Sequence, residues 1–150
     1  MKIYELGHAV LYVTNIEKST SFYRDILGFP VIGTASGMAA FSSGRTHHEL
    51  LLIEIGGKPK HKKVIEPGLY HLGFKIGNNE KELKAALQEL QKAKIEIVGT
   101  ADHTVTKSIY IKDPDGNEIE LYVDVSDEWK KNSQVVLSPV KTLQLQIFGN

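Results

Sequence analysis

The sequence contains no cysteine, and this absence removes three classes of site. The chain can have no disulfide framework, no thiolate nucleophile and no zinc site built on cysteine. Any metal must therefore be held by histidine and carboxylate side chains. The six histidines become the most informative residues of the sequence.

The chain also has no excess of charge of either sign. Lys and Arg together number 18, and Asp and Glu together number 18, so the formal net charge is zero. A neutral chain gives no electrostatic reason to expect nucleic acid or an anionic membrane as a partner. We therefore expect a small-molecule ligand, no nucleic acid and no membrane.

Long apolar runs are absent as well. The N-terminal sequence MKIYELGHAV lacks the apolar stretch and small-residue cleavage site of a secretory signal. No segment approaches the roughly 18 apolar residues of a membrane span. We expect a cytoplasmic protein. With 150 residues, 41% of them hydrophobic, the chain is long enough for one domain with a substantial core.

Residues 108–124, SIYIKDPDGNEIELYVD, predict two strands joined by a turn at Asp113-Pro114-Asp115-Gly116. The odd-numbered residues from 119 to 123 are apolar and predict a core face, whereas Glu118 and Glu120 lie on the opposite face. A carboxylate that faces inward is costly unless a cation meets it. This strand therefore indicates a metal site or a Lys or Arg partner.

Two further strand patterns each carry a histidine. Residues 5–13 and 68–76 alternate in polarity, and His8 and His71 lie opposite the more apolar face. A helix pattern follows each strand, with Thr14 or Asn15 as the first cap and Asn78 or Asn79 as the second. At an offset of 63, the two stretches match in their His, Asn, Glu and Lys residues. We interpret this as an internal repeat of a βαβββ module.

The fold class predicted is α+β: paired βαβββ modules form a curled mixed sheet around a cup, with the helices outside. One domain is expected over residues 1–132, with modules at about 3–57 and 66–125.

The basic stretch 56–63, GGKPKHKK, is expected to be a solvated connector rather than a phosphate clamp. We expect a short helix at 126–132, in which Trp129 packs on the sheet edge. The tail 133–150 would add an edge strand or meet a partner. Further strands are predicted at 29–33, 37–43, 47–55, 95–98, 106–112 and 117–124.

In such a fold His8, His71 and Glu120 would all face the cup. Two imidazoles and one carboxylate are the ingredients of a facial triad, which holds a divalent metal and leaves other positions for substrate and oxygen. Taken alone, each of these residues is more simply interpreted as a hydrogen-bonded structural side chain than as a metal ligand. Their equivalent places in a repeat favour a joint metal site.

These residues lie in three motifs: LGHAVLYVTNIEKSTSFYRDILGF, GLYHLGFKI and DPDGNEIELY. Over nearly all of residues 3–125 the chain resembles the vicinal oxygen chelate superfamily, which includes glyoxalase I, extradiol dioxygenases, and fosfomycin and bleomycin resistance proteins. The resemblance implies paired modules around a metal, a homodimer, and ligand roles for His8, His71 and Glu120.

The sequences Thr46-His47-His48 and Ala101-Asp102-His103, together with Tyr110, are similar to extradiol dioxygenases. This similarity implies ring cleavage of a catechol by O2 at Fe(II), with Mn, Zn or Ni as other metals. It implies that His48 handles protons. It also implies that Tyr110 hydrogen-bonds the bound catecholate. His103 is a further catalytic candidate, with a loop or capping role as its alternative. Tyr110 has an alternative as a β-sheet aromatic residue.

A second interpretation is a lyase similar to glyoxalase I, acting on a thiol adduct with four protein ligands. Glu54 is the candidate fourth ligand and base, because at an offset of 66 the sequence Ile53-Glu54-Ile55 matches Ile119-Glu120-Leu121. The alternative for Glu54 is a solvent-facing position. A third interpretation is a protein that binds a drug or metabolite without catalysis, and a fourth is another metalloenzyme branch such as a thiol transferase or epimerase.

Overall fold

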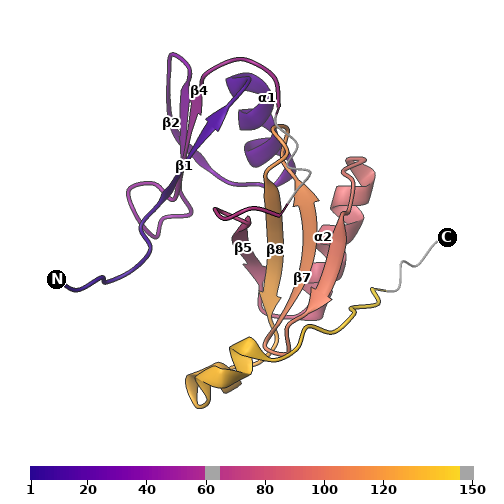
Figure 1. Ribbon diagram of the computed structural model, residues 1–150. Coiled ribbons are helices and arrows are strands. Elements are labelled where there is room, and N and C mark those ends of the chain that lie inside the picture. Colours follow the sequence, from indigo (N-terminus) through magenta and orange to yellow (C-terminus); the bar gives the residue numbers. More distant parts are fainter. Residues whose placement is uncertain (60–64, 146–150) are drawn as a thin grey trace. The chain divides into compact units, whose positions relative to one another are not determined.

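The computed structural model describes residues 1–59 and 65–145, and residues 60–63 of the predicted connector at 56–63 lie outside them. The chain forms two compact units, one over Met1–Val64 with Asp113–Gly116 and the other over Ile65–Lys112 with Asn117–Asn150. Each unit has a mixed four-stranded sheet and a helix (Figure 1). The predicted α+β class is confirmed.

The sheet of the first unit has the strand order β1-β4-β3-β2. Strands β1 (Ala9–Val13) and β4 (Leu50–Glu54) are parallel. The others, β2 (Val31–Ala35) and β3 (Met38–Phe41), pair antiparallel. The observed strands β1 and β4 are shorter than the predicted strands 5–13 and 47–55. As a result, His8 and His48 both lie just before a strand.

The helical segment of this unit begins where Asn15 accepts a hydrogen bond from the backbone N–H of Lys18. It runs as α1 (Ile16–Ser21) and continues as a π-helical turn, η1 (Phe22–Ile26). Gly28 follows with φ of 67°, a left-handed conformation that favours glycine and ends the segment.

Alternation along β1 separates core from surface as predicted. Leu11 and Val13 are buried, whereas Val10 and Tyr12 are exposed. Parallel pairing puts Leu11 beside Leu52, which is also buried. The odd-numbered face of β1 therefore builds the core, and the face with Val10 and Tyr12 does not.

The Asp-Pro-Asp-Gly turn belongs to the first unit. Asp115 accepts hydrogen bonds from the backbone N–H and the hydroxyl of Thr14, at 3.1 and 2.6 Å. Asp113 is buried and accepts one from the hydroxyl of Tyr23 at 2.9 Å. These carboxylates tie the turn to the junction between β1 and α1, a role that turn propensity alone did not indicate.

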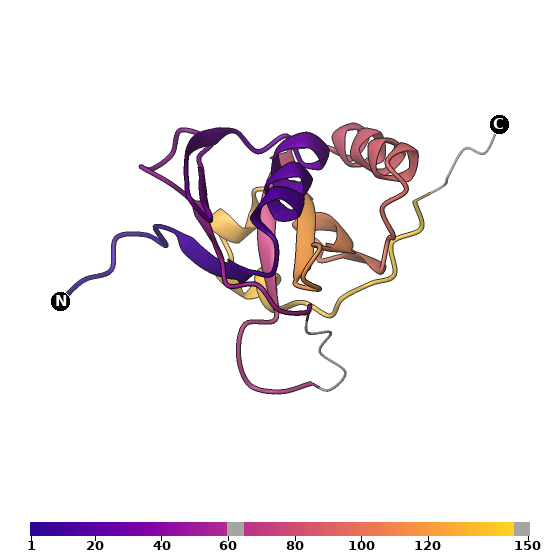
Figure 2. The same ribbon diagram turned by 90° about the horizontal axis from the view of Figure 1, so that it is seen from above.

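The second unit repeats the arrangement with the order β5-β8-β7-β6. Helix α2 (Glu80–Lys92) begins at the N-cap Asn79 and lies along one face of this sheet (Figures 1 and 2). The same connectivity in both units agrees with the predicted repeat of a βαβββ module. The strands are β5 (His71–Gly77), β6 (Gly99–Asp102), β7 (Thr106–Lys112) and β8 (Glu118–Asp124).

The predicted strand at 95–98 is wrong, because β6 begins at Gly99. Ile95 instead donates its backbone N–H to the carbonyl of Leu90 and so closes the end of α2. Lys94 has φ of 57°, which turns the chain back toward the sheet. These residues reverse the chain direction, and the backbone N–H of Val98 then makes the first hydrogen bond to β7, at the carbonyl of Tyr110.

After β8 the chain forms two short 3-10 helices, η2 (Glu128–Lys130) and η3 (Ser133–Leu137). Beyond them, Lys141 exchanges two backbone hydrogen bonds with Asp102 at the edge of the sheet, at 2.9 and 3.0 Å. Over its described part, the tail thus meets the edge strand β6 at a single isolated bridge. No helix among the described residues has the length and hydropathy of a membrane span.

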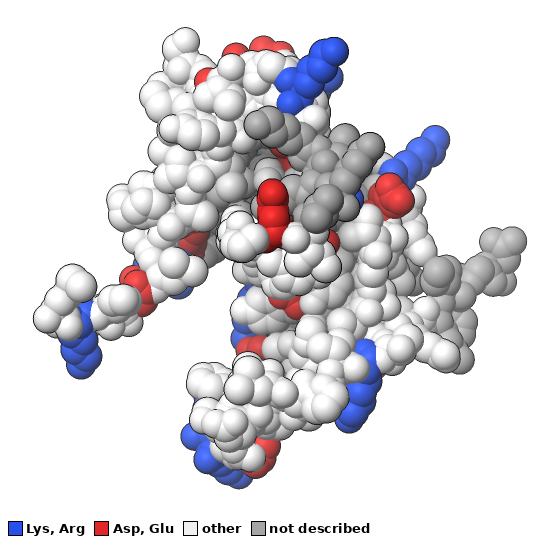
Figure 3. Space-filling view, viewed as in Figure 1, with Lys and Arg blue, Asp and Glu red and all other residues white. Residues whose placement is uncertain are grey.

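Acidic and basic side chains are interspersed on the face of the molecule seen in Figure 3. This mixture agrees with the net charge of zero. The chemistry of the protein must therefore be sought in local clusters of side chains.

Candidate metal centre

The face of the second sheet that α2 does not cover carries a carboxylate beside an imidazole. Parallel pairing of β5 with β8 puts His71 opposite Glu118 and Gly73 opposite Glu120, so these residues share one face. The imidazole Nε2 of His71 lies 3.1 Å from Oε2 of Glu120. The structure therefore brings two of the three predicted ligands together.

The other oxygen of Glu120 is held by hydroxyl groups from β7. Oε1 accepts a hydrogen bond from Ser108 at 2.6 Å and another from Tyr110 at 2.9 Å. Tyr110 in turn lies 2.8 Å from Nε2 of His103. The structure thus connects Tyr110 and His103, both predicted as site residues, to the carboxylate of Glu120.

The pair of His71 and Glu120 has the spacing of adjacent ligands. Bonds from a divalent metal to an imidazole nitrogen or a carboxylate oxygen are about 2.0–2.2 Å long, so ligands at right angles lie about 3 Å apart. The observed 3.1 Å fits that separation. With Oε1 engaged by hydroxyls, Oε2 is the oxygen left to face a cation.

Glu118 stands on the remote side of His71. Its Oε1 lies 3.7 Å from Nδ1 of His71, and both atoms are buried without a hydrogen-bond partner among the described residues. A metal-binding imidazole usually donates its other N–H to a carboxylate or carbonyl group, which fixes the ring orientation. Glu118 is positioned for that function, and the inward register predicted for it is confirmed.

Gly73 leaves space for the carboxylate of Glu120. A Cβ atom at this position would lie 3.3 Å from Oε2 of Glu120 and 3.5 Å from the ring of Tyr122. A side chain there would press on the oxygen that faces His71. The glycine therefore contributes to the room around the candidate metal position.

The electrostatics of the site keep Tyr110 protonated. Burial, and then the hydrogen bond to Glu120 and its negative charge, raise the pKa of the Tyr110 hydroxyl well above its usual range. Tyr110 is therefore a hydrogen-bond donor at neutral pH.

The first unit carries a separate cluster of imidazoles. The rings of His8 and His48 have centroids 4.4 Å apart, and one ligand atom from each of His8, His47 and His48 lies within 4.8 Å of the others. Loss of solvation, followed by the proximity of His47 and His8, lowers the pKa of His48. His48 is thus biased toward the neutral form. That His8 joins His71 and Glu120 at one metal stays a prediction.

The proposed equivalence of Glu54 and Glu120 is not supported by the strand registers. Ala9 pairs with Leu50, and Leu72, the counterpart of Ala9 in the repeat, pairs with Ile119. The offset between β4 and β8 is therefore 69 rather than 66, so Leu51 is the counterpart of Glu120.

Glu54 consequently lies on the face that builds the core of the first unit. A slip of three residues moves a strand side chain to the opposite face, because the side-chain period is two. At the strand end Glu54 is exposed, and its Oε2 accepts a hydrogen bond from the backbone N–H of Ile16 at 2.7 Å. This contact is at the start of α1, where a carboxylate is favourable.

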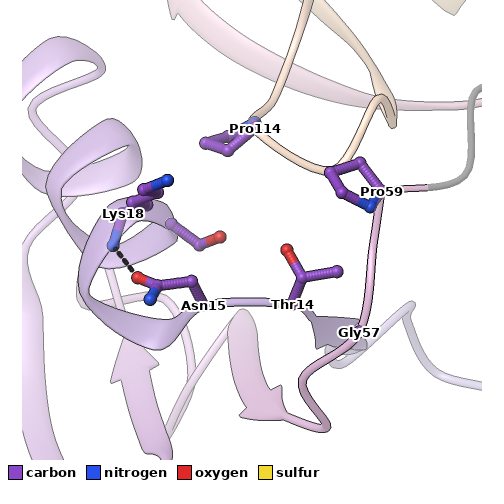
Figure 4. A pocket seen from close by; sticks show the side chains of 7 residues that line it. Thr14, Asn15, Lys18, Gly57, Pro59 and Pro114 are labelled. Carbon is purple, nitrogen blue, oxygen red and sulfur yellow. Dashed lines mark hydrogen bonds between the residues drawn. The ribbon is translucent and has the colours of Figure 1, made fainter.

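The first unit contains a cavity with a volume of about 290 Å³ (Figure 4). Among the described residues that line it, Lys18 is the one ionisable side chain, and Pro59 and Pro114 form part of the wall. These described lining residues include neither a metal-ligand pair nor a base beside a nucleophile. The cluster around His71 and Glu120 in the second unit therefore remains the candidate metal centre.

Ser108 was missed at the sequence level although the signal was present. The hairpin turn fixes Tyr110 opposite Glu120 and Ser108 opposite Tyr122. Ser108 is therefore the diagonal neighbour of Glu120 on the same face, within reach of its side chain. Counting pairs outward from the turn would have identified it.

Known proteins share this organisation. The model of the Glyoxalase/Bleomycin resistance protein/Dioxygenase superfamily matches residues 5–121. A catechol-2,3-dioxygenase of Bacillus subtilis is 34% identical over 119 residues, which cover 79% of this chain and 41% of that protein. The chain thus spans less than half the length of that relative.

Two further comparisons cover more of the related protein. The metallothiol transferase FosB of Staphylococcus haemolyticus is 32% identical over 119 residues, or 78% of this chain and 81% of the relative. The crystal structure of a glyoxalase/dioxygenase from Nostoc punctiforme superposes with a TM-score of 0.66 at 23% identity, covering 82% of this chain and 92% of that chain. The chain belongs to the Glyoxalase/Bleomycin resistance protein/Dioxygenase superfamily.

Proposed function

We propose that the protein is a metal-dependent dioxygenase that opens the ring of a catechol-type substrate. The observation that carries this proposal is the hydrogen-bond network on Glu120, in which Tyr110 and His103 adjoin the candidate metal ligand. A hydroxyl donor beside the ligand carboxylate suits a substrate that presents two adjacent oxygens. The similarity to a catechol-2,3-dioxygenase supports the same chemistry.

His71, Glu120 and His8 would hold the metal, for which we propose Fe(II). When bound, Fe(II) supplies a binding position for the two diol oxygens and the electrons that activate O2. Both atoms of O2 would enter the ring-opened product. We further propose that the protein acts in the cytoplasm as a homodimer.

Tyr110 would orient the substrate. Its raised pKa keeps the hydroxyl protonated, and the single proton that it donates to Glu120 in this structure would be donated instead to a deprotonated diol oxygen when substrate binds. His103, 2.8 Å from the Tyr110 oxygen, would hold that hydroxyl in place. The two residues together would align the diol beside Glu120.

His48 would accept a proton from the substrate. The lowered pKa of His48 favours the neutral imidazole at pH 7, which is the form that can act as a base. This role requires His48 to lie near the substrate hydroxyl, which is part of the proposal.

Ring cleavage has a direct test. The protein is loaded anaerobically with Fe(II) and mixed with 2,3-dihydroxybiphenyl or catechol, and O2 is then admitted. We expect a yellow ring-fission product and consumption of one O2 for each diol. Fe(II)-loaded protein that leaves both diols intact, while retaining bound metal, would contradict the proposal.

Thiol transfer is a second candidate, favoured by the 81% coverage of a metallothiol transferase. Loss of free thiol from glutathione or cysteine in the presence of fosfomycin and Mn(II) would support it. A glyoxalase-type lyase is less favoured, because the Glu54 carboxylate already accepts the backbone N–H of Ile16. Turnover of methylglyoxal with glutathione that is lost in Glu54→Gln would restore that candidate.

A further inference from the structure

A pocket of about 460 Å³ lies on the open face of the second sheet. The superfamily match ends at residue 121, yet part of the pocket wall comes from later residues. Trp129 belongs to η2 and Val136 to η3. The pocket is lined by His71, His103, Val105, Thr106, Tyr110, Glu120, Tyr122, Asp124, Trp129 and Val136.

The strand register gives the length of this wall along the sheet. Tyr110 is paired with Glu120, and Thr106 is paired with Asp124. The two pairs are four positions apart along each strand, which corresponds to about 13 Å. In Figure 1 the golden-yellow segment that follows β8 and contains η2 and η3 lies beyond the end of this strand. The pocket thus leads from the candidate ligands toward η2 and η3.

The far end of the pocket is neutral. Asp124 accepts a hydrogen bond from Lys75 at 2.5 Å, so its charge is already balanced. Val105, Trp129 and Val136 supply apolar surface there. An uncharged, apolar group is therefore the ligand chemistry that this end fits.

Trp129 and Val136 are incompletely covered by the protein itself. Their side chains are 45% and 55% exposed. Apolar side chains that face a pocket gain stabilisation when a ligand removes them from water. The two residues are thus positioned to bind a substituent rather than to build the core.

We propose that the segment formed by η2 and η3 determines substrate selectivity, with Trp129 and Val136 binding an apolar substituent of the aromatic diol. The inference rests on the proposed function for the position of the diol oxygens at His71 and Glu120. A cavity of about 150 Å³ suffices for one benzene ring. The pocket, at about 460 Å³, has room for a second ring.

The sole tryptophan of the chain provides a binding signal that needs no turnover. Protein loaded with Zn(II) is titrated anaerobically with 2,3-dihydroxybiphenyl and with catechol while the emission of Trp129 is followed. We expect saturable quenching by both diols, with a Kd about tenfold lower for the two-ring diol. Emission that does not respond to 2,3-dihydroxybiphenyl would overturn the inference.

Variants then locate the selectivity. We expect Trp129→Ala and Val136→Ala to lower kcat/KM for 2,3-dihydroxybiphenyl by about tenfold, through KM, and to leave kcat/KM for catechol within about twofold. Leu137→Ala is the matched control, because Leu137 is 79% exposed and does not line the pocket. Equal losses for the two diols would overturn the inference.

The two proposals fail in different ways. If neither diol is cleaved but 2,3-dihydroxybiphenyl quenches Trp129 more tightly than catechol does, ring cleavage is wrong and the binding site stands. If both diols are cleaved with the same kcat/KM in wild type and Trp129→Ala, the selectivity role is wrong and ring cleavage stands.

Discussion

The imidazole of His71 lies 3.1 Å from one carboxylate oxygen of Glu120, while two hydroxyl groups hold the other oxygen. A carboxylate fixed in this way cannot turn freely, so the oxygen near His71 keeps one direction. The two side chains come from the neighbouring parallel strands β5 and β8. Their separation is therefore set by the sheet and needs no loop to maintain it.

Removal of His71 should abolish stoichiometric metal binding. We expect His71→Ala to lose most of its bound divalent metal, measured by elemental analysis after loading and gel filtration, because the variant keeps only two of the three proposed ligands, Glu120 and His8. His47→Ala is the control, since His47 is an exposed imidazole outside the predicted triad. Loss in His47→Ala with full occupancy in His71→Ala would instead assign the metal to the three imidazoles of the first unit.

Ser108→Ala should weaken metal binding without removing a ligand. The hydroxyl of Ser108 is buried and donates to Glu120 at 2.6 Å, so its loss frees one side of the carboxylate. Partners of this kind contribute about 10–100-fold to metal affinity. A competition titration with a chromogenic chelator would measure the change. An affinity equal to that of the wild type would show that Tyr110 suffices to hold the carboxylate.

The sequence predicted the repeat and its strand faces because alternation with a period of two survives in both units. Leu11 and Val13 in β1 and Ile119 and Leu121 in β8 are all buried, as the pattern required. Alternation does not fix register, however. The motif around Glu54 matched the motif around Glu120 in polarity, and only the pairing of the strands revealed a slip of three residues.

The residue types of the candidate site could be predicted from the sequence, but the hydrogen bonds that connect them could not. His71 and Glu120 could be found from their register opposite the apolar faces. Contacts such as that between Ser108 and Glu120 depend on cross-strand geometry, which requires the pairing of β7 with β8. The role of Trp129 depends on the path of the chain after the sheet ends, for which no periodic pattern exists.

The pKa of His48 should lie below about 6.5, the usual value for histidine. Loss of solvation lowers the pKa, and the neighbouring imidazoles of His47 and His8 add to the effect. Proton NMR of the metal-free protein would measure the titration of the His48 ring. We expect His8→Gln to raise the pKa of His48 toward 6.5, and an unchanged value would contradict the assignment of His8 as a neighbour.

The same shift has a consequence for stability. Because folding lowers the pKa of His48, the unfolded chain binds more protons between the two values, and the free energy of unfolding falls as the pH drops below about 6.5. His48→Gln should remove this contribution. Urea unfolding at several pH values would detect a shallower pH dependence in the variant.

Tyr23→Phe should destabilise the first unit. The hydroxyl of Tyr23 is fully buried and donates to the buried carboxylate of Asp113, and burial with this charge raises the pKa of Tyr23. Loss of a hydrogen bond to a buried charged group costs about 1–3 kcal/mol. Tyr12→Phe, at a position that is 68% exposed, should change the free energy of unfolding by less than about 0.5 kcal/mol. Urea denaturation followed by circular dichroism compares the two, and equal effects would contradict the role of the Tyr23 hydroxyl.

Glu118 should act on the metal through His71. Within the described part of the chain, the Oε1 atom of Glu118 and the Nδ1 atom of His71 are both buried without a hydrogen-bond partner. They lie 3.7 Å apart, too far for a hydrogen bond but close enough to form one after a small rotation. Binding of a metal at Nε2 requires the proton to reside on Nδ1, from which the imidazole can donate a hydrogen bond to Glu118. We expect Glu118→Ala to lower metal affinity by about 10–100-fold and Glu118→Gln to lower it less, because the amide retains an acceptor oxygen.

The control for Glu118 is Glu96→Ala, which removes one exposed carboxylate elsewhere in the second unit and leaves the site untouched. If the two alanine variants bind metal equally well, the effect of Glu118 is only one of net charge. A second outcome is that Glu118→Ala binds metal as tightly as the wild type while Ser108→Ala binds it more weakly. In that case the geometry of the site depends on Glu120 alone, and the metal itself fixes the ring of His71. A lower affinity confined to the Glu118 variants would assign to this residue the orientation of His71.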